Sequence, residues 1–332
     1  MTRTSQDHWR VTGKAACVAL ILAACMSGGC LRRMEGDAWQ GTTKLRVLTT
    51  IVPLHCLAAR LGEPHAEVRC LCITNGPHEF QPTVEEARLF NGAEVVIANG
   101  LGLEGFLVPM IRGSGRRDLR VIRAAEELAK RGGALIEVPG YEHHGHMHGP
   151  GNDPHVWLGL EEAEQLAEII CETLCEMRPE NRAFFQQRLG QVRQRLAELR
   201  KLAEPLRTTQ GAVVTAHDAF RYLGRSVFGP GYEERLLAVR GLHGEELSPL
   251  EFTRLVQLCR EKNVRVLAVE PGSSPAILAR LQESLRENLK LIELDPIETA
   301  EPAAEKAFYV APQWYFERLE GNLRRLCEAL LP

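Results

Sequence analysis

"NRAFFQQRLGQVRQRLAELRKLAEPL", residues 181–206, is the stretch around which the chain is organised. Apolar residues recur in it at intervals of three and four, with Arg, Gln and Glu between them, which predicts one long amphipathic helix. At ~1.5 Å per residue this helix is on the order of 35–40 Å long, enough to run the length of a domain. It is therefore either an ordinary surface helix or a rigid connector between two lobes.

Strands and helices alternate on both sides of this helix, which favours the connector. Before it, "KLRVLTTIVPL" (44–54) predicts a buried strand running into a helix that Pro53 opens. After it, "GAVVTAH" (211–217) predicts a strand, and "SPLEFTRLVQLCREKN" (248–263) a helix with Ser248 as N-cap. Such alternation is typical of parallel sheets covered by helices on both faces. We predict an α/β fold of two similar lobes, each a mostly parallel sheet flanked by helices, joined by one long rigid helix.

These patterns divide the chain into five parts. Residues 160–206 are expected to be helical, with an interruption at Arg178-Pro179. The expected parts are a signal peptide (1–24), a tether (25–43), a first lobe with a His-rich loop (44–178, loop 141–149), the linking helix (179–206) and a second lobe (207–332).

The first residues predict export. Arg3, Arg10 and Lys14 precede an uncharged apolar run, residues 15–24, which is too short to span a bilayer comfortably. The run ends in Leu-Ala-Ala-Cys, which resembles the lipobox of bacterial lipoproteins and makes Cys25 the expected lipidation site. Cys30 is a second candidate, but it lacks the usual aliphatic residue three positions before it. We expect the mature protein to be anchored by lipid to the outer face of a bacterial membrane, periplasmic or at the cell surface.

Composition and cysteine spacing exclude some classes of function. The 332 residues carry a formal net charge of −3 with interspersed signs, so nothing indicates a nucleic-acid partner. Of the ten cysteines, the neighbouring pairs 70/72 and 171/175 lie within single predicted elements, where geometry disfavours a disulfide. We interpret most cysteines as small buried apolar residues, and a CxxC metal knuckle is absent from the sequence.

Four side chains of metal-ligand type stand where predicted strands end and loops begin. His78 lies in "NGPHEFQPT" (75–83), His155 in "NDPHVWLG" (152–159), His217 ends the strand "GAVVTAH", and Asp295 ends "LKLIELD" (289–295). Three imidazoles and one carboxylate suit tetrahedral Zn²⁺ better than Mg²⁺ or Ca²⁺, which prefer oxygen ligands. Each loop histidine alone has an ordinary interpretation as a surface residue, and the sequence spacing does not show that the four meet.

Beyond these residues, the chain resembles the metal-binding family of substrate-binding proteins of ABC transporters, the zinc and manganese cluster. The resemblance covers nearly the whole mature chain, and its motifs follow the order of the family. They are "TTIVPL", "NGPHEFQPT", "EVVIANGLGLEGFL", "NDPHVWL", "VVTAHDAFRYLG", "GEELSPLEF", "LAVEPGSSP" and "LDPI".

The resemblance implies a metal ion held in a cleft between the two lobes by His78, His155, His217 and Asp295, with Glu270 of "AVEPG" as a competing carboxylate. At the third ligand position, which is His217 here, manganese members usually have a glutamate and zinc members a histidine. His217 therefore favours Zn²⁺ over Mn²⁺. The implied partner is an ABC-type metal permease. We expect a monomer that is a receptor and not an enzyme.

Neighbouring residues could support or extend this site. Glu79 and Asp218 sit beside expected ligands and could orient imidazoles. His243 is expected on the loop surface. Gly159-Leu160 replaces the family's usual aspartate-proline, and "NGPHEF" lacks the aspartate that often precedes the first proline-histidine pair. These departures concern loop stiffness and helix capping rather than ligands.

The remaining histidines of residues 141–149 form a separate feature, expected to be a flexible loop. They are His143, His144, His146 and His148. Zinc members of the family often carry a His-rich, acidic insertion here, which suggests accessory capture of Zn²⁺. The alternative is a merely solvated polar loop.

Three other functions compete with a zinc receptor. A manganese-binding member of the same family differs only in its metal. A zinc hydrolase would need an open coordination position and a base, for which Glu79 is a nominal candidate, but no HExxH helix is present. An adhesin or sensor with the same fold would expose an apolar or aromatic patch away from the cleft.

Overall fold

The computed structural model describes residues 39, 41–78, 80–138, 141–143, 146–148, 151–240, 248–272, 276–285, 289–304 and 306–332. The expected signal peptide and both candidate lipidation sites, Cys25 and Cys30, lie outside the described residues.

The first lobe contains a parallel sheet with the strand order β2-β1-β3-β4. Its strands are β1 (Leu45–Ile51), β2 (Ala66–Cys72), β3 (Val95–Ala98) and β4 (Arg120–Arg123). Its helices are α2 (Val52–Gly62), α3 (Val84–Gly92), α4 (Leu107–Ser114) and α5 (Ala124–Lys130).

The second lobe repeats this arrangement, with the strand order β10-β9-β11-β12, again all parallel. Its strands are β9 (Ala212–His217), β10 (Leu236–Arg240), β11 (Val264–Val269) and β12 (Lys290–Glu293). Its helices are α8 (Arg221–Phe228), α9 (Pro249–Glu261) and α10 (Ala276–Leu285). In each lobe the first strand in the sequence pairs with both the second and the third. The predicted α/β fold of two similar lobes is confirmed, and α5, α8 and β10 add elements that the sequence patterns did not reveal.

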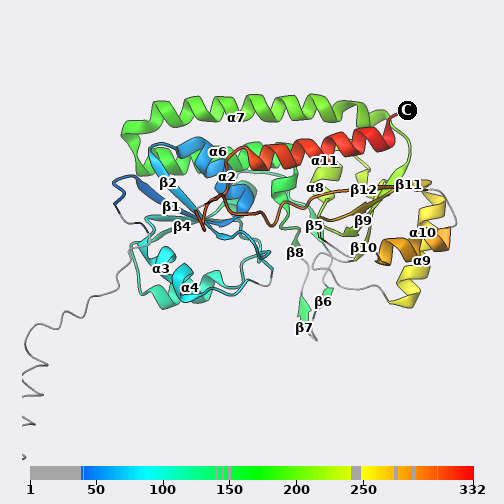
Figure 1. Cartoon of the computed structure of the whole chain (residues 1–332), viewed down its shortest axis with the longest axis horizontal. Coiled ribbons are helices and arrows are strands. Elements are labelled where there is room, and N and C mark those ends of the chain that lie inside the picture. The colour runs from blue at the N-terminus through cyan, green and yellow to red at the C-terminus, as the bar shows by residue number, and fades with distance from the viewer. Residues whose placement is uncertain are drawn as a thin grey trace, which may run out of the picture.

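Three long helices, α6 (Leu160–Met177), α7 (Arg182–Ala203) and α11 (Trp314–Leu330), connect the lobes. The expected interruption at Arg178-Pro179 is confirmed, because α6 ends at Met177 and a short 3₁₀ turn precedes α7. Figure 1 shows α7 running along one side of the molecule over both lobes, with α11 beside it. The buried residues of α7 recur at intervals of four and three, which gives the helix one continuous apolar face: Phe185, Leu189, Val192, Leu196, Leu199 and Ala203.

This face belongs to a core that continues through both lobes. One cluster of buried side chains includes Val47 and Ile97 from the first sheet, Leu196 from α7, and Val213 and Val266 from the second sheet. Two smaller clusters fill the outer faces of the sheets, one against α3 and α4 and the other against α9 and α10. Because the lobes share the central cluster, burial of apolar surface stabilises their mutual arrangement as well as each lobe.

Local sequence signals explain where several helices begin. Thr83 and Ser248 form capping boxes with Glu86 and Glu251, in which each side chain bonds the other residue's backbone N–H. Pro53 stands at the first turn of α2, where its missing N–H is not needed. The capping box of α3 follows directly on the loop that carries His78, so it fixes one end of that loop.

A second connection crosses between the lobes after β12. Ala300 N–H donates to Ile73 O (2.8 Å), and Cys70 N–H at the edge of β2 donates to Phe308 O (2.9 Å). His55 Nε2 on α2 lies 3.0 Å from Val310 O and 3.1 Å from Val310 N. Residues 298–311, which we call the crossing segment, therefore pack on the first lobe, although the sequence patterns group them with the second. α11 then returns alongside α7 (Figure 1).

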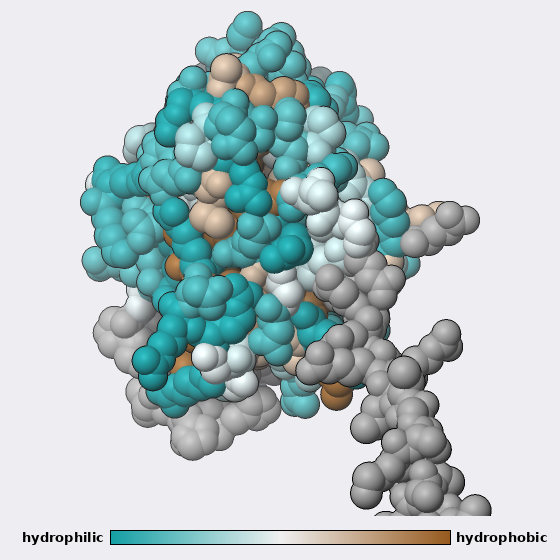
Figure 2. Space-filling view, turned by 90° about the vertical axis from the view of Figure 1, so that its left-hand side faces the viewer, coloured by the Kyte–Doolittle hydropathy of each residue, from teal (hydrophilic) through white to brown (hydrophobic). Residues whose placement is uncertain are grey.

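The surface of the described part of the chain exposes few large apolar side chains. Figure 2 shows a mainly hydrophilic face at the first-lobe end of the molecule. Large exposed apolar side chains among the described residues lie on four elements in two lobes and do not form one patch: Val84, Val108, Leu250 and Leu291.

The seven described cysteines are all free, and six are buried, as expected. No helix of the described part of the chain combines the length and apolar character needed to cross a bilayer.

Candidate metal centre

Three histidines far apart in the sequence meet at the carboxyl edges of the two sheets. His78 lies in the loop after β2, His155 directly precedes the 3₁₀ turn η1 (Val156–Leu158), and His217 is the last residue of β9. The imidazole centroid of His155 is 5.5 Å from that of His78 and 5.8 Å from that of His217. The structure thus brings together the three histidines that the sequence singled out, in the region where open parallel sheets place their ligands.

The carboxylate beside these histidines is Glu298, which the sequence interpretation did not single out. Its Oε1 lies 3.6 Å from His78 Nε2, 3.3 Å from His155 Nε2 and 4.0 Å from His217 Nε2. Around a tetrahedral ion with bonds of about 2.0–2.1 Å, two ligand atoms are separated by roughly 3.3–3.4 Å. The distances from Glu298 Oε1 to His155 and His78 are close to this separation, and the distance to His217 is longer. His155 Nε2 and Glu298 Oε1 are buried and form no hydrogen bond with any described residue.

His155 is held by Asp153, two residues before it. One oxygen of Asp153 accepts both the His155 backbone N–H (2.9 Å) and the ring Nδ1–H (2.7 Å), and both side chains are fully buried. Asn99, at the end of β3, donates to Pro154 O (2.9 Å) and so fixes the same loop from the other side. With Nδ1 occupied in this way, Nε2 is the ring nitrogen that faces the cluster. An aspartate two residues before a histidine in "NDPH" was the available signal for this arrangement.

His217 has a corresponding partner, Glu270, whose carboxylate bonds His217 Nδ1. Glu270 follows β11, the neighbour of β9, so the pair spans adjacent strand ends. Glu270, the competing ligand in the sequence interpretation, thus orients an imidazole. Asp218 does not orient one: its carboxylate accepts from Arg221 Nε (2.8 Å).

Asp295, the expected fourth ligand, contacts groups other than the three histidines through its carboxylate oxygens. Its Oδ1 accepts the Ile297 backbone N–H (2.7 Å), and its Oδ2 lies 3.7 Å from Arg318 Nε. Among the described residues, His78, His155 and Glu298 form a group whose potential ligand atoms all lie within 4.8 Å of one another, and His217 stands outside this group. The chain turns at residues 295–297, and the next acidic side chain, Glu298, lies beside the histidines instead.

Buried carboxylates make this place favourable for positive charge. Burial alone would lower the pKa of His155, but the carboxylates of Asp153 and Glu298 outweigh burial and raise the pKa to about 10. Burial alone would raise the pKa of Glu298, but His155 and His78 hold it well below its usual range. Glu298 therefore stays ionised beside the histidines, which favours a cation at this place.

Other candidate residues can be placed only in part. Glu79, His243 and His144 lie outside the described residues. The expected flexible loop of residues 141–149 contains two short strands, β6 (Tyr141–His143) and β7 (His146–His148), paired antiparallel. Backbone pairing of three-residue strands needs no apolar alternation, which explains why the sequence pattern did not reveal them. Figure 1 shows this β6–β7 hairpin at the lower edge of the molecule, below the two sheets.

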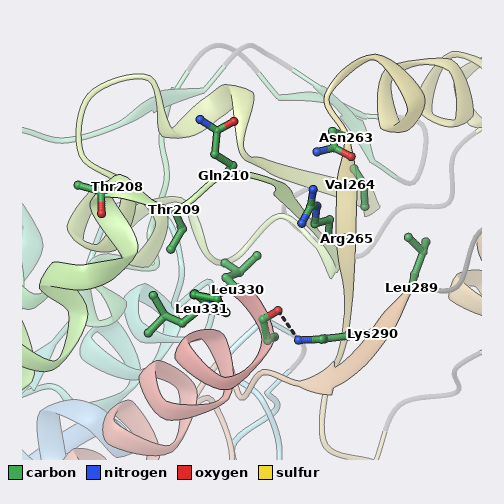
Figure 3. Close-up of a pocket in the computed structure, with 12 residues that line it drawn as sticks. Thr208, Thr209, Gln210, Asn263, Val264, Arg265, Leu289, Lys290, Leu330 and Leu331 are labelled. Atoms are coloured by element: carbon green, nitrogen blue, oxygen red, sulfur yellow. Dashed lines mark hydrogen bonds between the residues drawn. The ribbon is translucent and has the colours of Figure 1, made fainter.

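The second lobe also has a cavity of about 720 Å³, but at the opposite edge of its sheet. Arg265 and Lys290 line it at the amino ends of β11 and β12 (Figure 3). Lys290 Nζ donates to Ala329 O (2.9 Å) at the end of α11. The metal centre lies at the other end of the strands, about five residue steps of ~3.3 Å along β9. The cavity is therefore separate from the centre.

Comparisons with known proteins identify related chains. A family model described as "Zinc-uptake complex component A periplasmic" (ZnuA) matches residues 47–329. The zinc-binding lipoprotein AdcA of Streptococcus pneumoniae is 24% identical over 316 residues, which cover 94% of this chain but only 59% of AdcA. The manganese-binding lipoprotein MntA of Halalkalibacterium halodurans is 24% identical over 258 residues, 76% of this chain and 78% of MntA.

The fold has solved counterparts. The crystal structure of the AdcAII protein of Streptococcus pneumoniae superposes with a TM-score of 0.69 at 25% sequence identity, covering 87% of this chain and all of that one. The match includes nearly all of both lobes.

Proposed function

The chain belongs to the ZnuA family of metal-binding substrate-binding proteins of ABC transporters, and from that premise we propose that it captures Zn²⁺ outside the cytoplasm and delivers it to an ABC permease. His78, His155, His217 and Glu298 would hold the ion. We further propose that Cys25 carries a lipid anchor on the outer face of the membrane and that the receptor acts as a monomer.

One observation carries the proposal: three imidazole Nε2 atoms surround a single carboxylate oxygen at 3.3–4.0 Å. Three nitrogen ligands and one oxygen form a borderline set that favours Zn²⁺, whereas Mn²⁺ is better served by sites rich in carboxylate oxygen. Relatives named for zinc and for manganese both resemble this chain. The preference for zinc therefore rests on the donor atoms.

The family consists of transport receptors and not of enzymes. That membership argues against the zinc hydrolase considered from the sequence. A site with four protein ligands also differs from a catalytic zinc site, which keeps a coordination position open for water. The ion is accordingly cargo, and the ligands need only hold it and release it.

Metal titration of the mature protein tests the proposal. Replacement of His78, His155 or His217 by alanine removes one ligand each, so each variant should lose Zn²⁺ affinity by about two orders of magnitude or more. Competition between Zn²⁺ and Mn²⁺ on the unaltered protein should favour Zn²⁺. His65→Ala is a matched control, because that imidazole packs against Phe184, 4.6 Å between ring centroids, and should leave affinity unchanged. Affinity close to that of the unaltered protein in all three ligand variants would refute the site.

The His-rich residues 143, 144, 146 and 148 supply a second, weaker element of the proposal. We propose that they capture Zn²⁺ loosely before it enters the centre. Support comes from the number of imidazoles in this short segment and from the position of the β6–β7 hairpin directly upstream of the loop that carries His155.

A further inference from the structure

We propose that the turn Asp295–Ile297 positions Glu298 for the metal ion, and that Asp295 acts through this turn as a positioning residue and not as a ligand. The inference rests on the proposed metal centre. It assigns a role to Asp295, the expected acidic ligand, whose carboxylate contacts Ile297 N–H and Arg318.

Buried hydrogen bonds hold the turn at both of its ends. The side-chain amide of Asn322, on α11, accepts from Asp295 N–H (2.9 Å) and donates to Asp295 O (2.8 Å). The Asp295 carboxylate in turn accepts from Ile297 N–H (2.7 Å). Asn322 is fully buried and Asp295 is 6% exposed, so water does not compete for these bonds. The helix α11 thus fixes the backbone three residues before the carboxylate that faces the histidines.

The backbone at Ile297 has an unusual conformation. Its φ of +60° lies in the left-handed region, which residues with branched side chains rarely adopt. The side chain is also fully buried in the central core. Such a conformation persists only where the surroundings impose it. Here the bond from Asp295 to the Ile297 N–H and the packing of the side chain impose it together, and the chain direction changes immediately before Glu298.

The same turn is tied to His155 through Trp157. The indole Nε1–H donates to Pro296 O (2.8 Å), and the indole ring packs edge-on against the His155 imidazole, 5.2 Å between centroids. The Trp157 carbonyl accepts from the hydroxyl of Tyr315, another residue of α11. The helix α11 and the Trp157 indole therefore fix the positions of Glu298 and His155 relative to each other. An error in the turn would move Glu298 relative to His155.

A double-mutant cycle tests this role, with Zn²⁺ affinity of the full chain measured by competition against a chromogenic chelator. Asp295→Ala should weaken binding by about tenfold in the unaltered background. In the Glu298→Gln background the same change should lower Zn²⁺ affinity by less than about threefold, because the carboxylate that Asp295 positions is already lost. Asp295→Asn keeps an oxygen that can accept from Ile297 N–H, so it should stay within about threefold of the unaltered protein.

Other outcomes separate the possibilities. Equal losses from Asp295→Ala in both backgrounds would overturn the inference and indicate an independent ligand or a general loss of structure. If Asp295→Ala does not fold, Asn322→Ala takes its place in the same cycle with the same expectation. If the three histidine variants bind Zn²⁺ normally, the metal centre itself is wrong. If those variants lose binding while the cycle is additive, only the positioning role is wrong.

Discussion

At the scale of single residues, the centre depends on carboxylates that never need to touch the ion. Asp153 and Glu270 bond the Nδ1 atoms of His155 and His217 and leave the Nε2 atoms directed at the cluster. A metal-binding histidine whose second nitrogen is fixed in this way loses little orientational freedom on binding. The two pairs therefore contribute to affinity by preparing the ligands.

Glu270→Gln should show this contribution. The amide is a weaker acceptor for the His217 Nδ1–H, so Zn²⁺ affinity should fall by roughly 10–100-fold while the free energy of unfolding changes little. Competition titration and thermal unfolding measure the two quantities. Glu283→Gln, an exposed position on α10, is the matched control. Unchanged affinity in Glu270→Gln would show that this pair has no part in binding.

The sequence singled out the three histidines that lie together in the structure but not Glu298 beside them, for a physical reason. His78 and His155 follow prolines in loops and His217 ends a strand, so strand periodicity sufficed to place all three at one edge. Asp295 and Glu298 both follow β12, three residues apart, and which one turns inward depends on the left-handed conformation at Ile297. That conformation depends on the packing of Ile297 in the core and on the bonds from Asn322 of α11 to Asp295, which no local pattern contains.

At the scale of elements, capping and periodicity were the reliable signals. The Ser248 N-cap and the opening proline of α2 were predicted from the sequence and are present. The short elements α5, α8 and β10 were not predicted. α8 is an example: it has eight residues, and Gly224 and Ser226 interrupt its apolar pattern yet are buried against neighbouring elements. Tertiary packing rather than helix propensity supports such an element.

The β6–β7 hairpin supplies a prediction at this scale. Deletion of residues 142–149 should leave the tight site intact, because Asp153 and Asn99 hold the His155 loop independently of the hairpin. The deletion should remove only weak additional Zn²⁺ stoichiometry, which equilibrium dialysis at excess metal would measure. A second variant, with serine in place of the four histidines at 143, 144, 146 and 148, keeps the chain length and should also lose only the weak stoichiometry. Loss of the tight site in either variant would contradict the division into two functions.

At the scale of the whole molecule, the two-lobed plan was predictable and the crossing segment was not. Alternating strands and helices around one long helix define two parallel-sheet lobes. The described residues of the crossing segment contain no strand or helix, so periodicity gives no indication that they return to the first lobe. Their position comes from specific bonds, such as Cys70 N–H to Phe308 O (2.9 Å) and those of His55 to Val310.

His55 makes that attachment sensitive to pH. Burial lowers its pKa from 6.5 to about 4, so the imidazole stays neutral in the folded protein while the unfolded chain takes up a proton. Stability contributed by the neutral form is fully present above pH 6.5 and is lost as the pH falls toward 4. The loss should reach up to about 3 kcal/mol.

Chemical denaturation between pH 7 and pH 4 measures this loss. His55→Asn removes the titrating group, so the difference in unfolding free energy between pH 7 and pH 4 should be smaller in that variant by the same amount. The variant will be less stable at pH 7, because it also loses packing against Tyr309. Parallel pH profiles for both proteins would show that His55 does not titrate as proposed.

The crossing segment also has a kinetic consequence for the ion. The lobes are joined covalently in two directions, through α7 one way and through residues 298–311 the other, and α11 packs along α7 with an ion pair from Glu320 to Arg195. A wide separation of the lobes would disturb the core that they share. Glu298 stands where the chain leaves the second lobe. Exchange of the cargo is therefore expected to be timed by a small local step, the withdrawal of one carboxylate, and not by the separation of two rigid halves.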